Sequence, residues 1–183
     1  MSRFATCPHC AEIAPTRRAI IAGLAAVAVF PSAATAAIPS AGEDERFMRI
    51  AIDEARRADF PFGAVIARDG RILARGRNLG RTTDDPTAHG EMVAIRRALA
   101  AHGSKALRGA TIYTSGEPCA MCMGAILWCR FGRLVFAASV DQLAAKIDQT
   151  MISSADLAAK ASYAPIAITG GVLADEAMKL FTK

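Results

Sequence analysis

The chain has 183 residues, which is enough for one compact domain with a substantial hydrophobic core and hardly enough for two. Its formal net charge is +5 at pH 7, too mild to indicate a nucleic-acid-binding surface, so a nucleic-acid partner is not expected. Hydrophobic residues make up 52% of the chain, a high fraction for a soluble protein, and this requires a search for a membrane or export segment.

Residues 1–36 are predicted to be an export signal. Arg17 and Arg18 precede an uncharged apolar run at residues 19–30, and a small-residue cleavage site of the A-x-A type ends at Ala36. A spanning helix needs about 20 apolar residues, more than this run contains. The arginine pair resembles a twin-arginine signal. We therefore predict a periplasmic protein, with a cytoplasmic or inner-membrane-anchored protein as the alternatives.

The first half of the mature chain is predicted to contain a helix, a hairpin and a second helix. After a linker at residues 37–42, the apolar spacing from Glu43 onward is typical of an amphipathic helix. Two short apolar runs then flank Asp69-Gly70, a strong two-residue hairpin signal. A polar loop leads to a helix whose head carries His89.

The second half alternates strands with helices. The elements predicted there are a strand at 110–114, a helix opening at the cysteines, a strand at 133–139, a helix at 154–161, a strand at 166–169 and a helix from 174 onward. Together with the hairpin, this order predicts one domain over residues 43–183, an α/β fold with a mixed sheet covered by helices on both faces.

Three residues have the spacing and chemistry of zinc ligands. Cys119 and Cys122 are spaced C-x-x-C at a helix start, where both sulfurs share one face and the helix N-terminus favours the thiolate. His89 stands at another predicted helix N-terminus and adds a nitrogen. On its own a C-x-x-C pair could instead form a disulfide or simply pack, but the three together suit a tetrahedral zinc ion with one open position.

The remaining cysteines and histidines do not close this site. Cys129 lies about 10 Å beyond Cys122 along the same helix, and His102 lies about 20 Å beyond His89. A zinc–sulfur bond is about 2.3 Å long. The CPHC sequence at residues 7–10 resembles the redox motif of thiol-disulfide oxidoreductases, but it lies inside the predicted export signal and no strand precedes it. Three ligands and an open position indicate a catalytic rather than a structural zinc site.

Glu91 is placed to act as a proton shuttle. At two positions from His89 it points to a different side of the helix, so it is a poor ligand and can face the open position. A water activated by the metal would attack there, and a neighbouring carboxylate can take its proton and pass it to a leaving group. The alternative is an ordinary first-turn glutamate favoured by the helix dipole.

H-x-E followed by P-C-x-x-C is the signature of zinc-dependent nucleobase deaminases. The chain reads His89-Gly90-Glu91 and, at residues 118–122, PCAMC. On these residues, and over about residues 43–140, the chain resembles the cytidine-deaminase-like superfamily. The resemblance implies a three-layer α/β/α cytidine-deaminase-like fold, one Zn²⁺ per chain, a hydrolytic aminohydrolase and a homodimer.

Two branches of the superfamily share features with the chain. PFGAVIARDG, DPTAHGE and EPCAMCMGAILW look most like bacterial guanine deaminases, while DPTAHGE, EPCAMC and the tail ITGGVLADEA are also similar to tRNA adenosine deaminases. Phe62 and Trp128 match positions where guanine deaminases place aromatic rings around a purine, although both could be core residues. We therefore predict conversion of guanine to xanthine and ammonia. The alternatives are a tRNA-editing type of adenosine deaminase, a cytosine or cytidine deaminase, and a non-catalytic exported zinc protein.

The same resemblance implies further substrate contacts. Asn78 matches an asparagine that hydrogen-bonds the substrate, and an amide offers both donors and an acceptor. The backbone N–H of Gly90 would bind the ring carbonyl, and Asp148 aligns with an acidic residue that guanine deaminases use on the exocyclic amine. Two features depart from the pattern: Gly90 replaces the usual alanine, and the C-terminus lacks the aromatic tail of guanine deaminases.

Overall fold

The structure, a computed structural model, describes residues 41–181. The predicted export signal and residues 37–40 of the predicted linker lie outside the described residues. Within residues 41–181, none of the helices combines the length and the apolar content that crossing a bilayer requires.

The described part of the chain begins with a helix, continues with a hairpin and then alternates helices with strands. In chain order the elements are α1 (Ala41–Arg56), β1 (Gly63–Arg68), β2 (Arg71–Arg77), α2 (Gly90–His102), α3 (Ser104–Leu107), β3 (Thr111–Gly116), α4 (Ala120–Trp128), β4 (Arg133–Ala138), α5 (Val140–Ala144), α6 (Ser154–Lys160), β5 (Ala167–Thr169), α7 (Ala174–Met178) and the 3-10 turn η1 (Lys179–Phe181).

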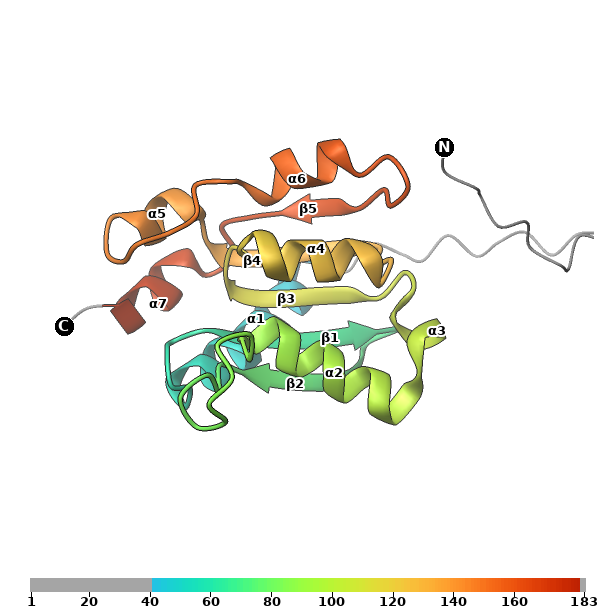
Figure 1. Cartoon of the computed structure of the whole chain (residues 1–183), viewed down its shortest axis with the longest axis horizontal. Coiled ribbons are helices and arrows are strands. Elements are labelled where there is room, and N and C mark those ends of the chain that lie inside the picture. Colours follow the sequence, from blue (N-terminus) through green and yellow to red (C-terminus); the bar gives the residue numbers. More distant parts are fainter. Residues whose placement is uncertain (1–40, 182–183) are drawn as a thin grey trace, which may run out of the picture. The chain divides into compact units, whose positions relative to one another are not determined.

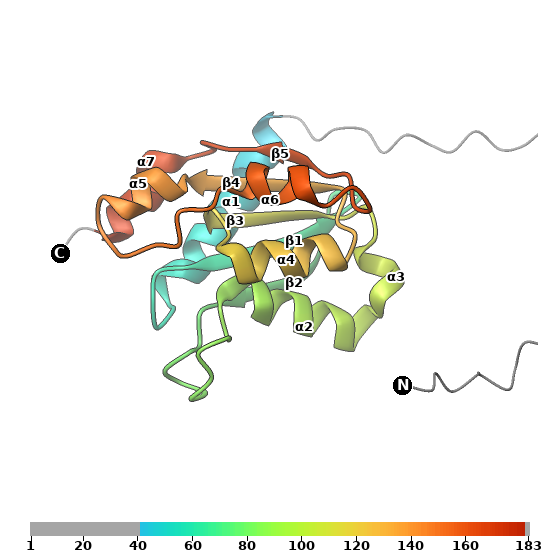
Figure 2. The ribbon, with the colours of Figure 1, turned by 45° about the horizontal axis from the view of Figure 1, so that its top comes forward.

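The five strands form one mixed sheet in the order β2-β1-β3-β4-β5. β1 is antiparallel to both β2 and β3, whereas β3, β4 and β5 are parallel to one another. Figures 1 and 2 show α2, α4 and α6 on one face of the sheet and α1 and α7 on the other. The predicted three-layer α/β/α fold is thus confirmed.

Alternate residues of the central strands supply the two cores. In β1, Ile66 packs under α2 and α4, while Val65 packs under α1. In β3, Ile112 likewise packs on the side of α2 and α4, and Tyr113 packs on the side of α1. Successive side chains of a strand point to opposite faces, so a sheet covered on both sides needs apolar residues at consecutive positions.

The hairpin between β1 and β2 is confirmed, and its turn explains the sequence. Asp69 and Gly70 both have positive φ, 50° and 71°. A two-residue turn with both residues in this region matches the right-handed twist of the strands, and aspartate and glycine adopt it at low cost.

Two strand glycines let helices approach the sheet unusually closely. A Cβ atom on Gly76 of β2 would lie 2.2 Å from the carbonyl oxygen of Gly90 and 2.4 Å from the nitrogen of Ala94, both in α2. On the other face, a Cβ atom on Gly63 would lie 2.2 Å from the carbonyl oxygen of Ala51 in α1. The start of α2, which carries the H-x-E motif, is therefore seated directly on the backbone of β2.

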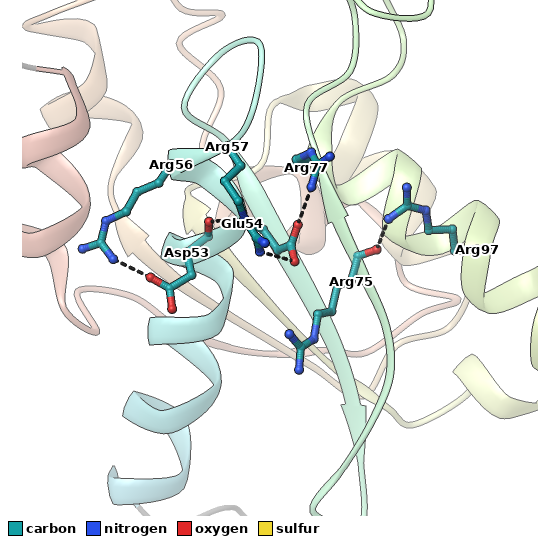
Figure 3. A network of polar contacts seen from close by, with 7 residues as sticks. All are labelled: Asp53, Glu54, Arg56, Arg57, Arg75, Arg77 and Arg97. Atoms are coloured by element: carbon teal, nitrogen blue, oxygen red, sulfur yellow. Dashed lines mark hydrogen bonds and ion pairs between the residues drawn. The ribbon is translucent and has the colours of Figure 1, made fainter.

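Polar contacts join the end of α1, the edge strand β2 and α2 (Figure 3). The buried carboxylate of Glu54 accepts a 2.8 Å hydrogen bond from Arg57 and lies 3.5 Å from the Arg77 guanidinium in β2. Arg97 of α2 donates to the Arg75 carbonyl of β2 at 3.0 Å. These arginine side chains bind carboxylate and carbonyl oxygens of the domain itself. Part of the net positive charge of the chain therefore stabilises the fold.

A largely buried ion pair ties the start of α1 to β4. Arg133 of β4 donates to both carboxylate oxygens of Asp44, each at 2.7 Å, and Tyr113 donates to the same carboxylate at 3.0 Å. Burial, followed by the negative charge of Asp44, raises the pKa of Tyr113 above its usual value, so its hydroxyl stays a donor.

The helix predicted from residue 174 onward is present as α7 followed by η1, whereas two short elements, α3 and α5, were not predicted. Each spans at most five residues, too few to show helical periodicity in the sequence. In addition, α1 begins at Ala41 rather than at Glu43, since alanine extends a helix readily and Glu43 and Asp44 favour its N-terminal turn.

Candidate active site

The candidate site lies at one edge of the sheet, where strands end and helices begin. β2, β3 and β4 run in the same direction, because β1 is antiparallel to its neighbours on both sides. Asn78 follows β2, Glu117 follows β3, and Phe62 precedes β1 at the same edge. The carboxyl ends of strands in an open α/β sheet are the usual place for a binding crevice.

His89, Cys119 and Cys122 come together at this edge. His89 is the residue that caps the N-terminus of α2, and Cys119 caps the N-terminus of α4. The Nδ1 atom of His89 lies 3.6 Å from the Sγ atom of each cysteine, and the potential ligand atoms of the three lie within 4.8 Å of one another. Cys122 is fully buried, one turn into α4.

This donor set fits a zinc ion. Two thiolates and one imidazole are typical zinc ligands, and three protein ligands leave one tetrahedral position for a reactant. Cys129 lies at the opposite end of α4, and the His102 Nε2 atom lies 3.1 Å from the Leu73 carbonyl oxygen. Among residues 41–181, the group that could hold a metal ion is therefore the predicted set of three.

The two cysteine thiols of the cluster differ in pKa. A hydrogen bond from Cys122, aided by the one to His89, lowers the pKa of the Cys119 thiol to about 4. The pKa of the Cys122 thiol is raised, because it holds the proton that the two sulfurs share and because it is buried. Metal binding needs both sulfurs deprotonated and releases that proton.

Glu91 is buried beside the cluster without belonging to it. Its exposed fraction is 5%, and its carboxyl interacts with the thiol of Cys122. Burial raises the pKa of Glu91 to about 7. A carboxyl group with a pKa near neutrality can both accept and donate a proton.

Three of the predicted substrate contacts surround the start of α2. Asn78 is buried, and its backbone N–H donates to the Phe62 carbonyl at 2.9 Å. Its side-chain oxygen accepts from the Gly80 N–H at 3.0 Å. The same Phe62 carbonyl lies against Gly90, where a Cβ atom would be 2.9 Å from it. Glycine in place of the usual alanine therefore permits a close approach of the two backbones.

The structure does not bring Trp128 or Asp148 to the cluster within one chain. Trp128 ends α4, nine positions or about 13 Å along the axis from Cys119. Its side chain is 75% exposed and packs on Tyr163, with ring centroids 5.1 Å apart. Asp148 is exposed, in the segment between α5 and α6.

The sequence reasoning missed two residues of this region, Phe181 and Glu117. Phe181 packs on Phe62, with ring centroids 5.3 Å apart, so the C-terminus does bring an aromatic ring to the Phe62 side of the site. An aromatic residue in the last turn was its only sequence signal. Glu117 is buried two positions before Cys119; its signal was an acidic residue directly before the Pro-Cys pair.

Comparison with known proteins settles the family. The model of the cytidine and deoxycytidylate deaminase zinc-binding region matches residues 41–138, more than half of the chain, and includes all three clustered residues and Glu91. The chain belongs to this family. The prediction of a zinc-binding deaminase domain is confirmed at this level.

Members of both predicted branches are similar to the chain. Guanine deaminase of Bacillus subtilis is 47% identical over 93 residues, which cover 50% of this chain and 60% of that enzyme. The chain thus spans less than two thirds of this relative. A solved tRNA:A34 deaminase structure is 34% identical, with a TM-score of 0.64, covering 74% of this chain and 98% of that one. A mutant protein solved with 8-azaguanine is 28% identical, with a TM-score of 0.68, covering 75% and 83%.

Proposed function

We propose that the chain is a zinc-dependent hydrolytic deaminase of a nucleobase or nucleoside. The observation that carries the proposal is the buried carboxyl of Glu91 beside the cluster of His89, Cys119 and Cys122. A purely structural zinc site has no use for a buried acid next to three ligands, because burying an ionisable group costs free energy. The rival, a non-catalytic exported zinc protein, leaves Glu91 without a role.

In the proposed reaction, water adds to the C=N bond of the substrate's amidine group, and the amino group then leaves as ammonia. A zinc ion bound at this site supplies Lewis-acid activation of the attacking water. Glu91 takes a proton from that water and delivers one to the departing amino nitrogen, as the carbon–nitrogen bond breaks.

Residues around the start of α2 would hold the substrate. The Gly90 N–H is the first of the helix, where no carbonyl within the helix accepts it, so it can donate to a ring carbonyl. The buried amide of Asn78 offers its Nδ2 donors, since its oxygen is bonded to Gly80. The aromatic pair of Phe62 and Phe181 would form an apolar wall for a flat ring.

Guanine is the proposed substrate. The 47% identity to guanine deaminase and the purine analogue in a similar structure support a free purine base. Adenosine in tRNA is the alternative, supported by the coverage of the tRNA deaminase structure and by the similar tail. Trp128 would reach a purine only in the site of a partner chain. Asp148 would reach one only after movement of the segment that bears it. Both substrate contacts stay predictions.

Ammonia release from guanine, adenine, adenosine, cytosine and cytidine tests the proposal. The purified, zinc-loaded protein should act on guanine at least about tenfold better, in kcat/KM, than on the others. A synthetic tRNA anticodon stem–loop with adenosine at the wobble position belongs in the same panel. Turnover of that stem–loop and of nothing else would show that adenosine in tRNA, and not guanine, is the substrate. If no compound were turned over, deamination would be refuted.

We also propose a periplasmic location, reached through the twin-arginine-like signal at residues 1–36. The paired arginines and the small-residue site support it. A signal of this kind exports folded proteins, so zinc would be bound before export. Mass spectrometry of the N-terminus of periplasmic protein should find a chain starting at Ala37. Uncleaved chains in the cytoplasmic or membrane fraction would contradict the proposal.

A homodimer is the proposed assembly. Met121 and Trp128 are exposed on α4, seven positions apart and therefore on one helix face, with Tyr163 beside Trp128. Exposed aromatic side chains are typical of protein interfaces. Light scattering should give twice the chain mass, and Trp128→Arg should reduce it to one chain. A wild-type monomer at micromolar concentration would contradict the assembly.

A further inference from the structure

Glu117 is a buried carboxylate that the proposed proton transfers do not use. It follows β3, two positions before Cys119, and its exposed fraction is 9%. One carboxylate oxygen accepts the Val140 N–H at 2.9 Å, and the other accepts the Ser154 N–H at 2.7 Å. Its own N–H donates to the Ala138 carbonyl, at the end of β4, at 2.7 Å. The side chain is thus satisfied at both oxygens by backbone from two distant segments.

The two donors have an equivalent place in the fold. Val140 is the first residue of α5, and Ser154 is the first residue of α6. The first N–H groups of a helix have no acceptor within the helix and carry a positive partial charge. A carboxylate between two such groups makes charge-assisted hydrogen bonds, which are strong where water is excluded.

These bonds attach both ends of the segment 140–154 to the residue that leads into the metal ligand Cys119. The segment consists of α5 followed by irregular chain that carries Asp148. Figures 1 and 2 show α5 and this chain on the same side of the domain as the starts of α2 and α4. Any shift of Glu117 would therefore move the segment relative to the metal site.

We propose that Glu117 is a positioning residue, which sets the distance between the segment 140–154 and the metal ligands and thereby controls how tightly the substrate is held. This inference rests on the proposed deaminase function and deepens it. Glu117 would act on the substrate through the position of the segment as a whole, since the exposed Asp148 lies outside the cluster. Glu117 itself need not touch the substrate.

Two variants remove the contact from opposite sides. Glu117→Gln keeps the size of the side chain but replaces one acceptor by an NH2 group, which then faces an N–H donor. Ser154→Pro removes the N–H that Glu117 accepts and puts a ring carbon in its place. Proline is well tolerated at the first position of a helix, and Ser153, at φ −70° and ψ 154°, already has the conformation required before proline.

Ser154→Ala is the matched control. It keeps the backbone N–H and removes only the hydroxyl, whose oxygen is buried without a hydrogen-bond partner in the part of the chain that the structure describes. Removing an unsatisfied buried hydroxyl should not weaken the domain. Any effect shared by Ser154→Pro and Ser154→Ala would come from the side chain and not from the bond to Glu117.

Amide hydrogen exchange of the zinc-loaded protein tests, without any substrate, whether Glu117 holds the segment 140–154 in place. In Glu117→Gln and Ser154→Pro, exchange within residues 140–154 should accelerate about tenfold or more, while α2 and β3 keep wild-type protection. Ser154→Ala should match the wild type. Unchanged exchange in Glu117→Gln, or equal acceleration throughout the domain, would overturn the inference.

Steady-state kinetics test the effect on the substrate. Glu117→Gln should raise KM about tenfold and leave kcat within about twofold, with one zinc per chain retained. Combined with Ser154→Pro, the two effects on KM should be less than multiplicative, because both variants break the same hydrogen bond. A fall in kcat at unchanged KM, or fully multiplicative effects, would refute positioning. A wild type inactive on every base would refute the proposed function. Hydrogen exchange would still show whether Glu117 holds the segment 140–154 in place.

Discussion

The Sγ atom of Cys119 lies 3.6 Å from the Nδ1 atom of His89, although thirty positions separate the two residues. Each caps the N-terminus of a helix that starts at the same edge of the sheet. Helix α2 follows β2 and α4 follows β3, the two strands on either side of β1, and both helices lie on one face of the sheet. The metal site thus depends on the seating of two helix starts and not on one local motif.

Loss of one sulfur should therefore abolish metal binding. Cys119→Ala should lower the affinity for zinc more than about 100-fold, since even loss of an outer hydrogen-bond partner of a ligand costs 10–100-fold. Zinc per chain after dialysis against a weak chelator measures this. Cys129→Ala is the matched control, because Cys129 lies at the far end of α4, and it should keep the wild-type zinc content. Equal zinc in both variants would contradict the ligand assignment.

Glu91→Gln should separate catalysis from metal binding. The variant keeps the shape of the side chain but can no longer accept and deliver a proton, so kcat should fall about 10²- to 10⁴-fold. Zinc content should stay at the wild-type value, because Glu91 lies beside the cluster and not within it. The deamination rate and atomic absorption are measured on the same preparation. A variant with wild-type turnover would exclude Glu91 as the proton shuttle.

Gly76→Ala should destabilise the domain at the seat of α2. The added Cβ atom would meet backbone atoms of Gly90 and Ala94 at 2.2 and 2.4 Å, and backbone cannot rotate away as a side chain does. We expect a loss of at least about 1–3 kcal/mol in the free energy of unfolding, measured by urea denaturation.

Gly42→Ala is the corresponding control in α1. A Cβ atom there would meet nothing within 4 Å, so the substitution should raise the free energy of unfolding by up to about 0.5–1 kcal/mol. A Gly76→Ala variant as stable as the wild type would contradict the close approach of α2 to the backbone of β2.

Arg133→Met should be strongly destabilising, because it leaves the Asp44 carboxylate buried without its partner. Breaking a buried pair in this way costs about 3–5 kcal/mol. Replacing the whole group, with Asp44→Leu, Tyr113→Phe and Arg133→Met together, should recover most of the loss, because no hydroxyl or carboxylate of the group is then left buried without a partner. Arg49→Ala removes an exposed ion pair with Glu45 and should cost less than about 1 kcal/mol. A combined variant as unstable as Arg133→Met alone would contradict this account.

The sequence by itself determined the chemistry and the local elements. His89, Glu91, Cys119 and Cys122 could be singled out because their spacing and residue types match a zinc site with an adjacent acid, which depends on neighbours along the chain. Asp69-Gly70 predicted its hairpin for the same reason, since a two-residue turn is a local preference. Helices and strands longer than five residues show their periodicity in the sequence and were predicted within a few positions.

The tertiary structure alone decided which distant residues meet. Phe181 packs on Phe62 because the C-terminal turn returns to the strand edge, and no local pattern encodes that return. Trp128 matches a substrate-binding position in sequence, yet the straight helix α4 carries it to the end opposite the metal ligands. Glu117 gains its two partners only when the starts of α5 and α6 are in place. Contacts of this kind depend on chain paths and packing, so they emerge only after the sheet is assembled.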